Sequence, residues 1–216
     1  MKLQLLKKGA EAYLYLDEWF GLKVVKKVRV VKSYRVGLLD EQLRKFRTAH
    51  EAKLLSSAKS FGVPTPVVFD VDVCKFTIVM EFIEGLLLKK LLPEVSDSER
   101  IRLCRLVGRN IGLLHSNGIF HGDLTTSNMI VQRDKIYFID FGLGGFSKEI
   151  EYFGVDLHLL LRVLESSHHE IAEECFSAIV DGYSSVFDKA DLVLKKVKEI
   201  RMRGRYVVER RAARRR

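Results

Sequence analysis

The chain has 216 residues, of which 47% are hydrophobic and 30% charged, so it is long enough for one sizeable domain or two packed lobes. No apolar run approaches the length of a membrane span, and the charged N-terminal segment has no small-residue cleavage site, so we expect neither a membrane protein nor a secreted one. The three cysteines are far apart and lack the spacing of metal ligands, which favours free thiols in the reducing cytoplasm.

The first part of the chain carries the patterns of strands and one helix. Between residues 3 and 35, β-branched and aromatic residues alternate with charged ones, which predicts strands. Apolar residues at helical spacing then predict a helix from about Asp40 to Lys59, which Gly62 and two nearby prolines end. Two more strands are predicted at 67–73 and 75–82, and Gly85 interrupts the pattern after them.

The second part is predicted to be mostly helical. A long helix follows Ser96 or Ser98, either of which can cap it, and its apolar residues recur on one face. Two short strands at 129–132 and 136–140 flank a turn, and helices follow from about Gly154. A strand-rich part followed by a helical part predicts an α+β fold.

The net charge of +9 is unevenly distributed. The segment 201–216 contains eight arginines and one glutamate, which give it a charge of +7 and leave +2 for the other 200 residues. A second basic run, from Lys23 to Arg35, contains no acidic residue. Such blocks bind phosphate groups when they are functional, and otherwise they form a solvated face or a frayed terminus. The composition leaves both interpretations open.

Two polar motifs lie at strand boundaries in the second part. The first runs from His121 to Asn128 (HGDLTTSN), and the second is DFG at residues 140–142. A carboxylate at Asp123 can orient a nucleophilic oxygen toward a terminal phosphate, and Asn128 and Asp140 offer the oxygen ligands that magnesium prefers. The alternative is an ordinary hairpin with turn residues at its ends. Both motifs together, in this order, favour the catalytic and metal-binding loops of a kinase.

A kinase also needs a lysine on its third strand, ion-paired to a glutamate on the following helix. Lys26 and Lys27 point to opposite faces of one predicted strand, and spacing alone allows either. Glu51 is the candidate for the helix glutamate. The alternative for Glu51 is a solvated charge on the helix surface, which is the commoner role of a glutamate.

Two further segments are placed like the nucleotide-binding parts of a kinase. A loop with a single glycine could cover the phosphates, and its residues are Gly9, Ala10, Glu11 and Ala12. Met80 ends a strand between the two parts, at the place of an inter-lobe hinge, and the backbone of Glu81 and Ile83 could hydrogen-bond adenine. The simpler interpretations are a turn and a strand that runs into a turn.

Several motifs resemble those of the small atypical serine/threonine kinase of the KEOPS complex, the PRPK family. They are HGDLTTSN, IDFGL and GVDL in the second part, and GAEA and RTAHEA in the first. The resemblance extends from Gly9 to Arg205 without insertions, and it implies a minimal two-lobed protein-kinase-like fold that binds ATP and Mg²⁺. It selects Lys27 as the phosphate-binding lysine with Glu51 as its partner, and it implies that Asp156 braces the catalytic loop.

The same resemblance implies partners, because this family acts in the synthesis of threonylcarbamoyl-adenosine in tRNA. The partners are a transferase subunit of the TsaD/Kae type, a small subunit on the N-terminal lobe, and tRNA bound through basic surface. The family autophosphorylates on serine or threonine, and in the complex it acts largely as an ATPase. The chain departs from the family at Val36-Gly37, where histidine and proline are usual, and at 206–209, which interrupts the basic residues.

We expect a kinase-like domain at 1–204 and a basic tail at 205–216, because apolar content falls and arginine dominates beyond Gly204. The domain would have an N-lobe to about residue 80, a hinge at about 81–85 and a C-lobe from there to 204. We expect the last helix to dock on the body and the segment beyond Gly204 to be mobile. The residues expected to contact RNA or the partner are Arg203, Arg205, Arg210 and Arg211.

Three other functions compete with this interpretation. A RIO-type kinase would have a longer glycine-containing loop, and a small-molecule kinase would have a larger acidic insertion after the hinge. A non-catalytic scaffold that recruits tRNA would not need the full set of site residues. Gly122 replaces the arginine with which regulated kinases hold an activation-loop phosphate, and only eleven residues separate DFG from the next predicted helix. An ATPase, or a kinase with one bound partner, is therefore favoured over a kinase with peptide substrates.

Overall fold

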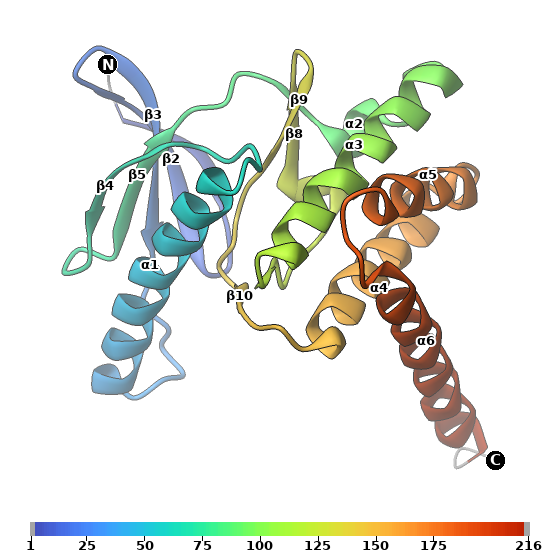
Figure 1. Ribbon diagram of the computed structural model, residues 1–216. Coiled ribbons are helices and arrows are strands. Elements are labelled where there is room, and N and C mark those ends of the chain that lie inside the picture. The colour runs from blue at the N-terminus through green and yellow to red at the C-terminus, as the bar shows by residue number, and fades with distance from the viewer. Residues whose placement is uncertain (1–2, 214–216) are drawn as a thin grey trace.

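The protein has two lobes in the computed structural model, which describes the backbone of residues 3–213 and the side chains of residues 3–203 (Figure 1). A five-stranded antiparallel sheet and helix α1 (Gly37–Ser60) form the first lobe, and helices dominate the second. This arrangement confirms the predicted α+β fold with a strand-rich N-lobe and a helical C-lobe.

The N-lobe sheet has the strand order β1-β2-β3-β5-β4. Its strands are β1 (Gln4–Lys8), β2 (Ala12–Trp19), β3 (Leu22–Arg29), β4 (Val68–Asp72) and β5 (Thr77–Glu81). Phe20 and Gly21 have positive φ angles of 47° and 81°, because the two-residue turn between β2 and β3 needs the left-handed conformation. Lys27 pairs with Leu14 on β2 and Ile78 on β5, which places this lysine in the middle of the sheet.

Helix α1 packs an apolar face against the core and ends where the sequence predicts. It begins at Gly37, slightly before the expected start near Asp40, and Gly62 follows its last turn with a positive φ of 85°. Leu54 and Leu55 on this face are fully buried, and Glu51 is buried one turn before them. The depth and rotation of α1 are therefore fixed by apolar packing next to a buried carboxylate.

The C-lobe is organised around helix α3 (Asp97–Ser116). The Oγ atom of Ser96 accepts a hydrogen bond from the Glu99 amide at 3.4 Å, so Ser96 is the cap of α3. Gly108 allows α5 to approach closely, because a Cβ atom there would lie 1.9 Å from the carbonyl oxygen of Ile179. The other C-lobe helices are α2 (Leu88–Leu91), α4 (Ile150–Ser167), α5 (Ala172–Ser184) and α6 (Ala190–Ala213).

Five short strands lie before, between and after the two motifs of the second part. They are β6 (Leu86–Leu87), β7 (Ile119–Phe120), β8 (Met129–Gln132), β9 (Lys135–Phe138) and β10 (Gly145–Phe146), with the 3-10 turn η1 (Thr126–Asn128) before β8. The pairing of β8 with β9 confirms the predicted hairpin. Helix α4 begins at Ile150, so its expected start near Gly154 is wrong by one turn. Its first turn contains Glu151, a residue type that stabilises a helix N-terminus.

Helix α6 continues through Gly204 to Ala213, so the predicted boundary between domain and tail lies inside this helix. A glycine lowers helix stability by about 1 kcal/mol but does not by itself end a helix. The mobility of the segment beyond Gly204 stays a prediction, and the side chains of Arg205, Arg210 and Arg211 lie outside the described residues. Within residues 3–213, no helix is long and apolar enough to cross a membrane.

Candidate active site

The loop that carries Asp123 is fixed by a carboxylate from helix α4. One oxygen of Asp156 accepts a hydrogen bond from the His121 amide at 2.6 Å, and the other accepts one from the Gly122 amide at 2.8 Å. The Nε2 atom of His115 lies 3.4 Å from the same carboxylate. Asp156 is buried, and these contacts are those that the sequence resemblance implies for a brace of the catalytic loop. The loop is therefore held by hydrogen bonds to its backbone.

Gly122 has a structural reason to be glycine. Its φ angle is +77°, and a Cβ atom at this position would lie 2.1 Å from the carbonyl oxygen of Leu143. The segment after DFG therefore lies directly against the catalytic loop. An arginine that could hold an activation-loop phosphate does not fit at this position.

Asp123 and Asn128 form a small hydrogen-bonded unit on this loop. The Nδ2 atom of Asn128 donates to the carbonyl oxygen of Asp123 at 2.9 Å and to its Oδ2 atom at 2.8 Å. The amide of Asn128 thereby fixes the orientation of the Asp123 carboxylate. In this orientation the Oδ1 atom of Asn128 is left as an acceptor for a cation.

Asp140 lies at the end of β9 in a backbone conformation that is uncommon for aspartate. Its φ angle is +66°, and its side chain is 49% exposed. The carboxylate lies 2.6 Å from the Nζ atom of Lys27. Burial opposes its ionisation, but the adjacent Lys27 ammonium outweighs this effect and holds the pKa of Asp140 below its ordinary value.

Lys27 also reaches Glu51 on α1, as the sequence predicts for the lysine–glutamate pair. The Nζ atom of Lys27 lies 2.7 Å from the Oε1 atom of Glu51, and both residues are buried. Burial opposes the charge of Lys27, but Glu51 and Asp140 together raise its pKa above the ordinary value. Lys26 points to the other face of the sheet, where it pairs with Asp17 at 2.5 Å.

Arg29 is a member of this ion-pair network that the sequence analysis did not single out. Its Nη2 atom lies 2.6 Å from the Oε2 atom of Glu51 and also donates to the carbonyl oxygen of Arg47 at 3.3 Å. Each oxygen of Glu51 therefore has its own cation. Arg29 is buried, so the basic run from Lys23 to Arg35 is not one continuous phosphate-binding surface. Arg29 follows Lys27 by two residues, which places both side chains on the same face of β3, and this spacing is the sign of its role in the sequence.

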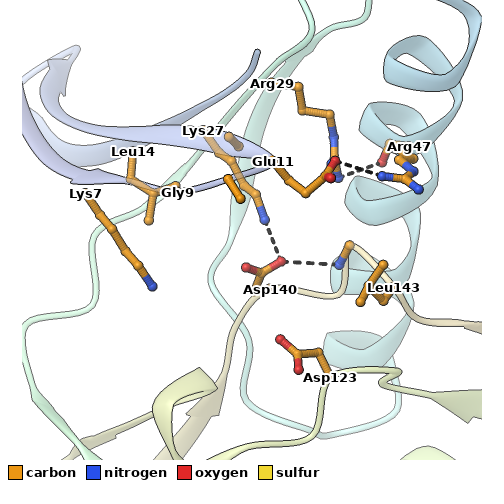
Figure 2. A pocket seen from close by; sticks show the side chains of 13 residues that line it. Lys7, Gly9, Glu11, Leu14, Lys27, Arg29, Arg47, Asp123, Asp140 and Leu143 are labelled. Carbon is orange, nitrogen blue, oxygen red and sulfur yellow. Dashed lines mark hydrogen bonds and ion pairs between the residues drawn. The ribbon is translucent and has the colours of Figure 1, made fainter. Parts of the chain in front are cut away.

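A cavity of about 300 Å³ lies between the sheet and these loops (Figure 2). Lys27 approaches it from above and Asp123 from below, and Asp140 lies between them. The residues that line it are Lys7, Gly9, Ala10, Glu11, Ala12, Leu14, Lys27, Arg29, Arg47, Asp123, Asp140, Gly142 and Leu143. Residues that are far apart in the sequence, from both lobes, thus meet at one site.

The predicted phosphate-covering loop forms part of the cavity wall. The amide of Gly9 donates to the carbonyl oxygen of Ala12 at 3.0 Å, which closes a tight turn between β1 and β2. Glu11 at the tip pairs with Arg47 on α1 at 2.8 Å. Lys32 donates a hydrogen bond to the carbonyl oxygen of Ala10. The loop is therefore attached to α1 and to the segment after β3.

The predicted hinge residues lie apart from this cavity. Met80 and Ile83 are buried at the end of β5, and the Glu81 amide donates to the carbonyl oxygen of Val67 at 2.8 Å. The Glu81 amide is therefore already used, and the expected adenine contact at this residue would have to come from its carbonyl oxygen. Among the described residues, the cavity lining includes none of these three hinge residues and does not include Asn128.

The donor set at this site suits magnesium. Asp140 offers a carboxylate and Asn128 an amide oxygen, and Mg²⁺ commonly binds through one or two such groups together with substrate phosphates. Within the described part of the chain, no group of three or more histidine, cysteine, aspartate or glutamate side chains could hold a metal by itself. These residues fit a cation that is bound together with a phosphate ligand.

Comparisons with known proteins define the class of this fold. The family model described as the RIO domain matches residues 24–143, which span β3, α1 and both motifs of the site. The solved structure of the Rio2 kinase–ADP/Mg²⁺–phosphoaspartate complex from Chaetomium thermophilum aligns with a TM-score of 0.57 and 17% identity, over 89% of this chain and 69% of that one. WaaP in complex with acyl carrier protein aligns with a TM-score of 0.54 and 14% identity, over 88% of each chain. The class is that of kinase-like proteins with a RIO domain.

Curated relatives narrow this class to one family. The KEOPS complex subunit Bud32 of Pyrococcus abyssi is 49% identical, over 94% of this chain and 96% of that protein. A probable bifunctional tRNA threonylcarbamoyladenosine biosynthesis protein of Methanothermobacter thermautotrophicus is 47% identical over 94% of this chain, but the chain spans only 36% of its length. The chain belongs to the family of the KEOPS complex subunit Bud32, which confirms the resemblance seen in the sequence.

Proposed function

We propose that this protein is a Mg-ATP-dependent atypical serine/threonine kinase and ATPase that supports threonylcarbamoyl-adenosine modification of tRNA. The observation that carries the proposal is the convergence of Lys27, Asp123 and Asp140 on one cavity, with Asn128 hydrogen-bonded to Asp123. A phosphoryl-transfer site needs these groups, because its catalysis consists of positioning and of electrostatic stabilisation.

Each residue has a role in this proposal. Lys27, oriented by Glu51, binds the α- and β-phosphates, and Mg²⁺ is held by Asp140 and Asn128. Asp123 orients the attacking oxygen, which belongs to a serine or threonine in the kinase reaction and to water in the ATPase reaction. The loop from Gly9 to Ala12 covers the phosphates. The hinge at Met80, Glu81 and Ile83 binds adenine.

The proposed partners follow from the family. They are a transferase subunit of the TsaD/Kae type, a small KEOPS subunit on the N-lobe and tRNA. Contacts with RNA or the transferase are assigned to Arg203, Arg205, Arg210 and Arg211. Arg203 already lies 2.8 Å from Glu151 on α4, and 61% of its side chain is exposed. Such an exposed ion pair is weak, so a phosphate or a partner carboxylate can replace Glu151.

The segment after DFG supports ATP hydrolysis, or transfer to one bound partner, over phosphorylation of many peptides. It is short, and Gly144 packs tightly within it, because a Cβ atom there would lie 2.7 Å from the carbonyl oxygen of Phe120. This segment leaves little chain for a peptide-docking platform. Gly122 excludes the arginine on which a phosphate switch would depend.

The test is turnover of ATP by the purified protein, alone and with a purified TsaD/Kae-type subunit. We expect Mg²⁺-dependent release of phosphate, phosphate incorporation on serine or threonine, and a changed hydrolysis rate when the subunit is present. Affinity purification from the native host should recover that subunit. ATP turnover by neither preparation would contradict the enzymatic proposal, and failure to recover the subunit would contradict the assignment of the partner.

The basic end of the chain can be tested separately. Removal of residues 210–216 should weaken tRNA binding and flatten its salt dependence, which is roughly 0.7 to 0.9 log units in affinity per log unit in salt for each phosphate contact. Removal from Arg203 onward should also reduce stimulation of the transferase subunit. Equal tRNA affinity of the full chain and the shorter truncation at every salt concentration would remove the outer arginines from the proposal.

A further inference from the structure

Lys7 on β1 faces the cavity because the strand register shifts just before it. Leu5 pairs with Tyr15 on β2, but Lys7 pairs with Leu14, so Leu6 is an extra residue in β1. Cross-strand partners lie on the same face of a sheet, and Leu14 lines the cavity. Without the shift, Leu6 would oppose Leu14 and Lys7 would point away. Bulges of this kind often re-aim a side chain beside an active site.

The same register aligns two lysines across three strands. Leu14 pairs with Lys7 on one side and with Lys27 on the other. Adjacent strands are about 4.8 Å apart, so the two lysine backbones are separated by roughly 10 Å. Both side chains extend from this sheet face toward the cavity (Figure 2). Their ammonium groups can therefore approach the same ligand from two sides.

Lys7 differs from the other positively charged residues that line the cavity, because each of those has an ion-pair partner. Lys27 pairs with Glu51 and Asp140, Arg29 pairs with Glu51, and Arg47 pairs with Glu11. Within residues 3–203, the side chain of Lys7 has no hydrogen bond or ion pair, although it lines the same cavity. It is thus the one lining cation, among the residues that the structure describes, without a carboxylate partner.

We propose that Lys7 binds the polyphosphate chain of the nucleotide, as a second ammonium opposite Lys27. This inference rests on the proposed ATP-binding function and assigns to it a residue outside the predicted phosphate-covering loop. A nucleoside triphosphate carries more negative charge than one Mg²⁺ ion neutralises, and the paired cations of the cavity are already partly compensated. A lysine without an ion-pair partner, on a flexible side chain, neutralises part of this remaining negative charge when the phosphates bind.

The test compares Lys7→Ala with Lys8→Ala in the full chain, because both variants lose one positive charge from the same strand. Lys8 does not line the cavity, and its ammonium lies 5.4 Å from the centre of the Tyr13 ring. Binding of ADP and of adenosine is measured by titration calorimetry with Mg²⁺ present. Lys7→Ala should weaken ADP binding roughly five- to tenfold and leave adenosine binding unchanged, as expected for one partly solvated ion pair. Lys8→Ala should bind both as the parent does.

Further variants and conditions separate a local contact from a general charge effect. Lys7→Arg should retain most of the ADP affinity, and the deficit of Lys7→Ala should shrink in high salt. Equal ADP affinities of the two alanine variants would overturn the role of Lys7 and leave the proposed function intact. An equal loss of adenosine and ADP affinity in Lys7→Ala would also overturn it, because the phosphates would not be what Lys7 recognises. Failure of the parent to bind ADP would overturn both proposals.

Discussion

The two sides of the cavity are built in different ways. On the C-lobe side, Asp123 is held by the amide of Asn128, and its loop is held by the buried carboxylate of Asp156. On the N-lobe side, Lys27 is held by ion pairs to Glu51 and to Asp140. The C-lobe contacts involve the backbone of the loop, whereas the N-lobe contacts join long side chains from separate elements.

The loop of Asp123 on the C-lobe side is therefore preformed, whereas the ion pairs of Lys27 on the N-lobe side would have to rearrange when a ligand binds. Asp156 and Asn128 place the catalytic loop before any nucleotide is present. In the proposed function Lys27 binds phosphate and Asp140 binds Mg²⁺, so nucleotide binding would redistribute the contacts of this ion pair. Glu51 can keep Lys27 in place during this change, because Arg29 compensates its second oxygen.

The largest effect is expected at Asp123. Asp123→Asn should lower the rate of ATP hydrolysis on the order of 100-fold or more, because the residue orients the attacking oxygen and accepts its proton. The shape of the loop should be kept, so the midpoint of thermal unfolding and the affinity for ADP should stay near those of the parent. Turnover at the parental rate would remove Asp123 from the mechanism.

Lys27→Ala should lower kcat/KM for ATP roughly 10- to 100-fold, the loss expected for a hydrogen bond between charged groups. Lys26→Ala is the matched control, because this lysine lies on the opposite sheet face and pairs with Asp17. The control should retain most of the activity. A larger loss in Lys26→Ala than in Lys27→Ala would mean that the assignment of the phosphate-binding lysine is wrong.

Asp156→Asn tests the preformed side of the cavity. The side-chain amide of asparagine cannot accept hydrogen bonds at both of its ends, so either the buried amide of His121 or the partly buried amide of Gly122 loses its acceptor. The free energy of unfolding in urea should fall by about 1–3 kcal/mol. The turnover rate should fall more than the affinity for ADP, since the substitution acts on the loop of Asp123 and leaves Lys27, the phosphate-binding residue of the proposed function, in place. Asp70→Asn, at an exposed position on the edge strand β4, is the control and should change neither quantity.

Much of this arrangement follows from the sequence, and the exceptions have physical reasons. The positions of Asp123 and Asp140 were predictable, because a motif and its strand boundary fix each of them. The pair of Lys27 and Glu51 was predictable only from the family resemblance, because spacing alone also allowed Lys26. Arg29 was not, because its burial depends on how closely α1 approaches β3. The orientation of Lys7 was not predictable either, because one extra residue in β1 reverses its face and leaves no local signal.

Two further details of the structure are not visible in the sequence. Helix α6 passes through Gly204, where composition predicted a change, because one glycine weakens a helix without ending it. The adenine contact at Glu81 stays a prediction, and the sequence does not show that the Glu81 amide is bonded to the carbonyl oxygen of Val67. Such contacts depend on neighbours that are distant in the sequence.

Lowering the pH should destabilise the preformed C-lobe side of the cavity, with a smaller effect than the substitutions above. His115 and His121 are fully buried, and burial lowers the pKa of each below its ordinary value. The unfolded chain therefore takes up protons first, and stability that is present above about pH 6.5 is lost as the pH falls toward the folded-state pKa. Each group contributes at most about 1.4 kcal/mol per pH unit. The free energy of unfolding in urea, measured at pH 7.5 and at pH 5.5, gives this loss of stability. His115→Gln should reduce the difference between the two values. An unchanged difference would exclude His115 as a source of the loss.

The most direct test of the account is the effect of Mg²⁺ on ADP affinity in the parent and in Asp140→Asn. In the parent, Mg²⁺ should tighten ADP binding, because Asp140 exchanges its contact with Lys27 for the cation. In Asp140→Asn, most of this effect should be lost, since an amide replaces the carboxylate in the metal site. Metal-free binding should be as tight as in the parent or tighter, because the substitution removes a negative charge beside the phosphates and frees Lys27. An equal response to Mg²⁺ in both proteins would contradict the account.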